Sequence, residues 1–312
     1  MTTAMAEKPI SEKASPARHT SESGVHDDGL SAFAEVRPRL FGIAYRVLGS
    51  AAEAEDIVQD VWLRWQATNR SVVENPPAFL ATITTRMCIN FAQSAQSRRE
   101  TYVGSWLPEP VDTRSDPSLG AERGEALKLA VLILLEKLPP TERAAYVLRE
   151  AFDYSYREIA EILQIEEANA RQLATRARKH VTDERRTTVS ADDQRRLLEA
   201  FIHAAQKGDL AALEGLFAED VVSYSDGGGI VRTAARVPVT GRERVAKFIA
   251  AFASHFWMGM ELTWVETNGQ ASVLLSRYGV PAALATIDAS TEGIDRIMWV
   301  LRPSKLTGIS LP

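Results

Sequence analysis

Basic and amide side chains gather in one short stretch of this 312-residue chain. Between Glu167 and Arg186 stand six Arg or Lys residues against three Asp or Glu residues, although the whole chain carries a formal net charge of −5. Such side chains hydrogen-bond to base edges and to phosphates, so the chemistry that this stretch predicts is DNA binding. The residues that would make these contacts are Asn169, Arg171, Gln172, Thr175, Arg176, Arg178 and Lys179.

A helix-turn-helix over Ser155–Lys179 would position these side chains. Ile159 and Ile162 lie on the inner face of the first helix, Ile165 fills the turn, and Leu173 packs the second helix back onto the first. This packing leaves the polar residues on the outer side, where a recognition helix enters a major groove.

The alternative is an ordinary amphipathic helix pair with a solvated basic face. Two residues favour it. Gln164 occupies the turn position where glycine most easily adopts a left-handed conformation, and Glu167 would repel a phosphate. The agreement of turn spacing, packing residues and polar face favours DNA binding.

A second helical pattern runs from Leu30 to Arg99, with apolar residues at three- and four-residue steps. A loop over Ala67–Asn75 interrupts it. Pro76 and Pro77 then announce a third helix through Phe79–Gln93, because proline is tolerated in the first turn of a helix.

Both helical parts resemble the extracytoplasmic-function group of RNA polymerase sigma factors. Ala54–Trp65 is similar to the helix of sigma region 2 that docks on the polymerase clamp, which places region 2 at 29–100. Ala126–Val181, with its string Leu138–Arg143, resembles sigma region 4, which we place at 121–187, after a linker over 101–120. The two lack the intervening regions of housekeeping sigma factors, as is typical of this group.

The resemblance implies partners and contact residues. The partners are core RNA polymerase, through its beta and beta-prime subunits, and promoter DNA, with the helix-turn-helix at the −35 element. Without the resemblance, the polymerase-contacting residues would be read as ordinary solvated or core helix positions. Core-polymerase contacts are implied for Asp56, Gln59, Asp60, Trp62 and Leu63, and capture of an unstacked −10 base for Asn69, Arg70, Arg86 and Asn90.

The last third of the chain, 190–312, has a different pattern. Helices are expected near Asp192–Gln206, Leu210–Phe217 and Arg242–Phe256, and they precede alternating, strand-like runs. This part resembles the SnoaL-like α+β cone domains. The expected fold is multidomain, with two all-α sigma domains followed by this α+β domain. The predicted strands are Glu261–Val265, Ala271–Leu275, Ala282–Ile287 and Arg296–Leu301.

Three strings resemble those of sigma factors with such a fused domain. They are Trp106–Pro110, Asp226–Gly229 and Arg302–Leu306. Ile230 stands where the family usually has a basic residue, and the third string begins Arg-Pro-Ser where the usual start is Asn-Pro-Asp. We expect the linker to dock on the glycine-rich edge and to control promoter geometry in cis, although a plain turn would also explain the glycines. The predicted interdomain residues are Trp106, Leu107, Pro108, Asp226, Gly227, Gly228, Gly229 and Lys305.

Composition narrows the remaining classes. Polar residues 1–28 predict a disordered tail, and no run approaches the roughly 18 apolar residues of a membrane span, so a cytoplasmic protein without membrane contact is expected. The single cysteine, Cys88, rules out an intramolecular disulfide. No metal, cofactor or catalytic residue is predicted.

Two other classes stay open. One is an autonomous helix-turn-helix regulator with a small-ligand-binding domain. The other is a cyclase or isomerase of the cone class that uses Asp226, His203, His255 or Asp288 in an apolar cavity. A small ligand or self-association through the C-terminal domain is compatible with each reading.

Overall fold

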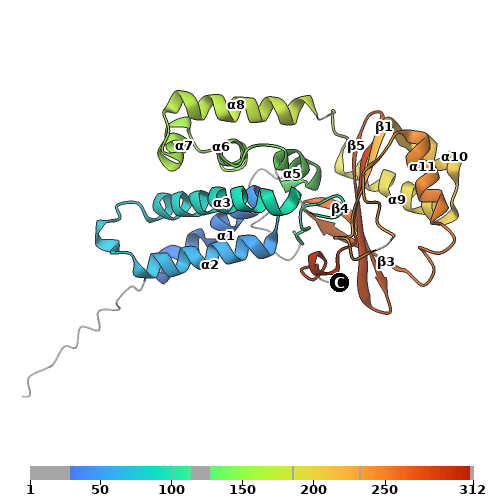
Figure 1. Cartoon of the computed structure of the whole chain (residues 1–312), viewed down its shortest axis with the longest axis horizontal. Coiled ribbons are helices and arrows are strands. Elements are labelled where there is room, and N and C mark those ends of the chain that lie inside the picture. Colours follow the sequence, from blue (N-terminus) through green and yellow to red (C-terminus); the bar gives the residue numbers. More distant parts are fainter. Residues whose placement is uncertain (1–28, 101, 114–126, 185, 232, 310–312) are drawn as a thin grey trace, which may run out of the picture.

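The computed structural model describes residues 29–100, 102–113, 127–184, 186–231 and 233–309 (Figure 1). The predicted tail over 1–28, and the start of the second helical unit, which was expected at residue 121, lie outside the described residues.

The first helical unit contains α1 (Leu30–Leu48), α2 (Ala51–Ala67) and α3 (Pro76–Glu100), with a 3₁₀ turn η1 (Arg70–Val72) in the predicted loop. Gly49 ends α1 in the left-handed region at φ 70°, and the Ser50 side chain caps α2 by accepting a hydrogen bond from the Glu53 N–H. The third helix is longer than predicted at both ends.

The second helical unit contains α5 (Leu129–Glu136), α6 (Pro140–Glu150), α7 (Tyr156–Leu163) and α8 (Glu167–Asp183). A capping box between Ser155 and Glu158 starts α7, and Gln164 ends it at φ 56°. Gln164 therefore adopts the left-handed conformation that the turn requires, without glycine.

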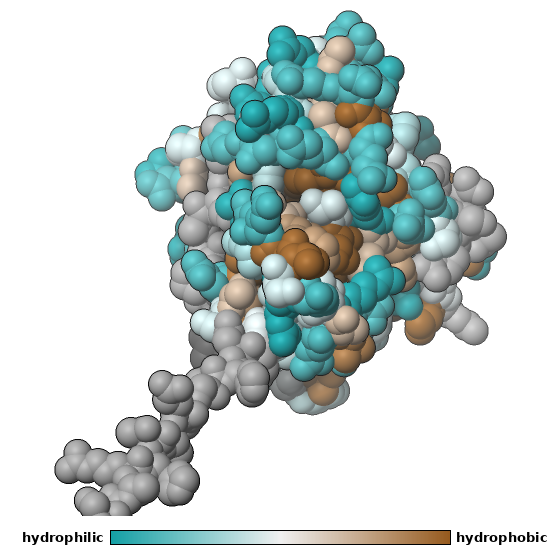
Figure 2. Space-filling model, turned by 90° about the vertical axis from the view of Figure 1, so that its left-hand side faces the viewer, coloured by the Kyte–Doolittle hydropathy of each residue, from teal (hydrophilic) through white to brown (hydrophobic). Residues whose placement is uncertain are grey.

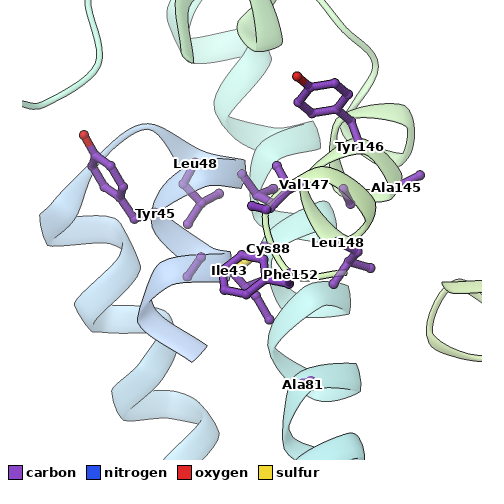
Figure 3. Packing of buried hydrophobic residues seen from close by; sticks show 14 of the residues in the cluster. Ile43, Tyr45, Leu48, Ala81, Cys88, Ala145, Tyr146, Val147, Leu148 and Phe152 are labelled. Carbon is purple, nitrogen blue, oxygen red and sulfur yellow. The ribbon is translucent and has the colours of Figure 1, made fainter. Parts of the chain in front are cut away.

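The two helical units share one hydrophobic core. Figure 3 shows Ile43 of α1, Cys88 of α3, and Val147 and Phe152 from α6 and the residues after it, all directed into the same space. The Arg143 guanidinium, largely buried, donates to the Val47 carbonyl oxygen at 2.8 Å and so joins α6 to α1. The two units thus pack as one body in this arrangement.

A six-stranded sheet with the order β2-β1-β6-β5-β4-β3 forms the C-terminal domain. Helices α9, α10 and α11 cover one of its faces (Figure 1). The helices are α9 (Ala191–Lys207), α10 (Leu210–Leu216) and α11 (Arg242–Ala251), and the strands are β1 (Phe217–Asp226), β2 (Val239–Thr240), β3 (Glu261–Thr267), β4 (Gln270–Arg277), β5 (Val280–Ser290) and β6 (Gly293–Val300).

The sequence-based prediction of this domain was wrong at three points. It missed the short β2, and it missed β1, which pairs in parallel with β6. The reason is that Ser223, Ser225 and Asp226 are buried although they are polar, so the strand lacks the usual alternation of apolar and polar residues. The last helix also ends at Ala251 instead of Phe256.

The other face of the sheet packs against α5. Leu129, Ala130 and Ile133 of this helix join Leu274 and Met298 of the sheet in one cluster. Its other side belongs to the core of the helical units, which explains why every residue from Leu129 to Leu135 is buried. In the described parts of the chain, no helix is both long enough and apolar enough to cross a membrane.

Candidate nucleic-acid interface

Helix α8 presents the predicted DNA-binding residues to solvent. All seven, from Asn169 to Lys179, are exposed, whereas Ala170, Leu173 and Ala177 are buried against the rest of the second helical unit. The packing positions therefore match those of a recognition helix. The face that they leave outside carries polar and charged side chains, apart from Ala168 near the start of the helix.

Acidic residues neighbour the arginines of this face. Arg176 lies 3.3 Å from the Glu142 carboxylate of α6, and the Nε of Arg178 donates to Glu150 at 3.1 Å. The hydrogen bond with Glu150 raises the pKa of Arg178 above its ordinary value. The two arginine side chains stay exposed, whereas the Glu142 and Glu150 side chains are only 12% and 24% exposed.

Most of the predicted polymerase-binding face of α2 is also accessible. Asp56, Gln59, Asp60 and Leu63 are exposed, and Leu63 keeps 55% of its surface. Trp62 is half-buried and its ring packs 4.9 Å from that of Phe33. Figure 2 views the molecule from the end that carries the helical units, where hydrophilic residues surround apolar ones that reach the surface.

The four predicted −10 residues do not form one cluster. Asn69 is exposed and accepts hydrogen bonds from Ser71, whereas Arg70 lies over the Trp65 ring at 5.9 Å. Arg86 lies ten residues, or about 15 Å, beyond the start of α3. Asn90 is exposed one further turn along.

Arg86 is engaged by the second helical unit. Its Nε donates to the Ile162 carbonyl oxygen at 2.9 Å and an Nη donates to that of Glu161 at 3.4 Å. These carbonyls belong to α7, the first helix of the helix-turn-helix. The contact between α3 and α7 therefore occupies a side chain that was predicted to bind DNA.

A third group of residues joins the linker to the sheet domain. The Asp226 carboxylate, fully buried, accepts hydrogen bonds from the Leu107 N–H at 3.0 Å and the Tyr102 hydroxyl at 2.5 Å, and it lies 2.7 Å from Lys305 Nζ. The Lys305 ammonium also donates to the Leu107 carbonyl oxygen and lies 4.4 Å from the centre of the Trp106 ring. We call Tyr102, Leu107, Asp226 and Lys305 the Asp226 latch.

Tyr102 is a member that sequence reasoning missed. Burial, and next the hydrogen bond to Asp226, raise its pKa to about 12. Arg302 donates to its hydroxyl at 3.3 Å. The signal in the sequence was weak, because Tyr102 precedes the Trp106 string and stands alone.

The glycines beside Asp226 are needed for close approach. A Cβ atom on Gly227 would lie 2.5 Å from the Ala234 Cβ, and one on Gly229 would lie 3.0 Å from the Val103 Cβ. Gly228 and Gly229 also have φ values of 58° and 73°, which other residues rarely adopt. The segment Gly227–Gly229 is thus more than a plain turn, because its lack of side chains lets the linker approach its backbone.

The other side of the linker contacts the first helical unit. Trp106 leaves no space for a side chain at Gly49, where a Cβ atom would come within 2.7 Å of the ring. The Glu109 carboxylate accepts hydrogen bonds from the Ala51 N–H and the Ser50 hydroxyl, each at 3.0 Å, at the N-terminus of α2. Pro108 lies 3.6 Å from the same Gly49 position. The linker therefore bridges α2 and the sheet domain.

The residues considered for catalysis are not brought together. Asp226 belongs to the latch, Asp288 lies 3.0 Å from the Arg296 guanidinium, and His203 is exposed on α9. His255 hydrogen-bonds to its neighbour Ser254. An apolar cavity does lie in the domain, and the described residues that line it include no titratable side chain. They are Ser225, Thr233, Phe248, Ile249, Phe252, Phe256, Trp257, Trp299 and Leu301.

The second helical unit carries a helix-turn-helix with an exposed basic face, and a docked linker contacts the first helical unit. These features define a DNA-binding transcription protein. Comparison with known families narrows the class. Residues 32–98 match the model of Sigma-70 region 2, and residues 128–181 match that of Sigma-70, region 4.

Whole-chain relatives show the family. The chain is 36% identical over 297 residues to the ECF RNA polymerase sigma factor SigJ of Mycobacterium tuberculosis, covering 90% of this chain and 94% of the relative. It is 30% identical over 275 residues to the probable ECF RNA polymerase sigma factor SigI of the same species, covering 86% and 88%. The chain belongs to the extracytoplasmic-function RNA polymerase sigma factors.

A solved structure supports the same assignment. The crystal structure of Mycobacterium tuberculosis SigJ superposes with a TM-score of 0.72 at 31% identity, covering 91% of this chain and all of that one. The likeness therefore extends over the C-terminal sheet domain as well as the helical units.

Proposed function

We propose that this sigma factor binds core RNA polymerase and directs it to promoters. In this proposal the first helical unit contacts the polymerase through α2 and reads the −10 element through η1 and α3. The second unit reads the −35 element through α8. The observation that carries the proposal is the exposed polar face of α8 on a buried apolar scaffold, in a chain whose two helical units match sigma regions 2 and 4.

We infer that the helical units do not read a promoter in this arrangement. The −10 and −35 elements are separate sites along the duplex, so the two units must reach two places at once. Helix α3 spans about 38 Å and α8 about 26 Å at 1.5 Å per residue, and α3 touches α7. The two units must therefore separate before both elements can be contacted.

We infer that the sheet domain controls this separation in cis. The linker is held to the sheet domain by the Asp226 latch and to α2 by Glu109, so it cannot extend while both contacts exist. Arg39 adds a direct restraint, because it donates to the Phe152 carbonyl oxygen at 3.0 Å and lies 4.9 Å from the Tyr154 ring. Release of the linker would allow the units to move apart.

The sheet domain has no proposed catalytic role. Sigma factors are not a class of enzymes. Action on RNA polymerase places the proposed site of function in the cytoplasm.

The direct test is run-off transcription with purified core RNA polymerase on a library of candidate promoters. Promoter-specific transcripts would support the proposal, and failure to bind core enzyme would refute it. Tight binding of duplex DNA by the free chain would instead favour an autonomous regulator.

Truncation after Val189 is a poor test of the sheet domain, because it would expose Leu129, Ala130 and Ile133 of α5. Trp106→Ala is the better variant.

A further inference from the structure

The turn between β3 and β4 is half buried, because its first residue, Asn268, is buried whereas its second, Gly269, is exposed. Asn268 and Gly269 form this two-residue turn with φ values of 55° and 69°. Positive φ at both positions is typical of type I′ turns, in which Asn-Gly is a favoured pair. Yet Asn268 has no exposed surface.

Asn268 touches three separate parts of the chain. Its Nδ2 donates to the Tyr45 hydroxyl of α1 at 2.7 Å and to the Leu127 carbonyl oxygen, just before α5, at 2.9 Å. Its Oδ1 accepts from the Val111 N–H of the linker at 3.1 Å, and its own N–H donates to the Val111 carbonyl oxygen at 2.9 Å. A primary amide has two donor hydrogens and an acceptor oxygen, and here all are used.

The linker continues the pairing around this turn. Asp112 forms a bridge with Thr267, and the Thr113 hydroxyl donates to the Glu266 carboxylate at 2.8 Å. On the side of the first helical unit, the Tyr45 hydroxyl donates to the Glu109 carbonyl oxygen at 2.6 Å. A chain of hydrogen bonds therefore runs from Asn268 through Tyr45 to Glu109.

We propose that Asn268 is a positioning residue through which the sheet domain clamps both helical units and the linker, as a restraint separate from the Asp226 latch. The inference rests on the proposed function, since it assumes that the units separate for transcription. Asn268 lies outside the three strings Trp106–Pro110, Asp226–Gly229 and Arg302–Leu306 that resemble those of related sigma factors. Aspartate could not replace it, because a carboxylate lacks the two donor hydrogens that Tyr45 and Leu127 accept.

The test compares two turns of the same sheet. Asn268→Gly keeps the left-handed backbone and removes only the amide side chain. Tyr278→Gly is the matched control, because Tyr278-Gly279 connects β4 to β5 with φ values of 54° and 74° while Tyr278 is 91% exposed. Labels on cysteines introduced at Gln66 and Asp183, both exposed, report the separation of the helical units, and the native Cys88 is fully buried.

We expect Asn268→Gly to increase the population with separated labels about tenfold, because groups left unpaired in the interior lose their hydrogen bonds. Transcription at limiting sigma factor should rise in parallel, and Tyr278→Gly should change neither. Tyr45→Phe should also open the chain, and the double variant should open it by less than the product of the two single effects.

Unchanged label separation in a folded Asn268→Gly chain would overturn the inference. If that variant does not fold, Asn268→Asp provides the same test without altering the side-chain shape, and it too should open the chain. The label measurement uses free protein, so it is independent of polymerase. A wild-type chain that fails to transcribe would refute the proposed function and leave the clamp to be decided by the label separation alone.

Discussion

Replacing Lys305 with methionine should release the linker from the sheet domain. Lys305 and Asp226 have side-chain exposures of 9% and 0%, and methionine would leave the carboxylate buried without its cation. Removing one partner of a buried ion pair costs about 3–5 kcal/mol. The hydrogen bonds from Tyr102 and Leu107 remain, so we take about 3 kcal/mol, which corresponds to about a hundredfold shift toward the undocked linker.

The measurement is transcription at limiting sigma factor, together with the rate of proteolysis in the linker. Both should increase in Lys305→Met. The matched control is Lys247→Met, which removes the same side chain from an exposed pair with Glu243 and should leave both readouts unchanged. The double variant Asp226→Asn with Lys305→Met should be less affected than Lys305→Met alone, because asparagine has no charge to leave unpaired. Two results would refute the reasoning. One is wild-type transcription and proteolysis in Lys305→Met. The other is a larger increase in both readouts for the double variant than for Lys305→Met alone.

Three further predictions concern other contacts. Arg176→Ala should weaken −35-dependent transcription. It should also reduce the slope of log binding constant against log salt concentration by about one for the holoenzyme, as measured by promoter titration at several salt concentrations. Gly229→Ala should destabilise the docked linker by about 1–2 kcal/mol because φ is 73° and Val103 is close, and linker proteolysis would report it. The raised pKa of Tyr102 means that its neutral form stabilises the latch below pH 10 and that this stability is lost as pH rises toward 12. Tyr102→Phe should weaken the pH dependence of linker proteolysis in this range, while the ammonium of Lys305 still contributes to it.

Local sequence patterns predicted the helical units well because their elements are amphipathic. The apolar residues of the helix-turn-helix repeat at helical spacing, so Ile159, Ile162 and Leu173 identify the inner face without knowledge of the rest. The Trp106 and Asp226 strings were associated through resemblance, and the structure brings them into contact. The roles of the DNA- and polymerase-binding residues stay predictions.

Contacts between distant segments were harder to predict. Nothing near Asn268 in the sequence indicates burial, since Asn-Gly is the ordinary signal of an exposed hairpin turn. Likewise, Arg86 was assigned to DNA from its position on a helix, while its contact with Ile162 depends on how the two helical units pack. Such contacts are set by tertiary packing, which periodicity does not report.

The packing also indicates why the free chain should stay closed. Separating the helical units exposes residues such as Val47, Leu48 and Phe152, and lifting the sheet domain exposes the apolar face of α5. Burying one such side chain is worth about 1.5–3 kcal/mol, so breaking a few polar restraints cannot by itself make an open state dominant. A partner must cover the exposed surface, and it shifts the equilibrium only as far as it binds the open state more tightly. Core RNA polymerase is the partner expected to do so. We therefore expect the closed, acidic chain to have little affinity for duplex DNA until the polymerase opens it.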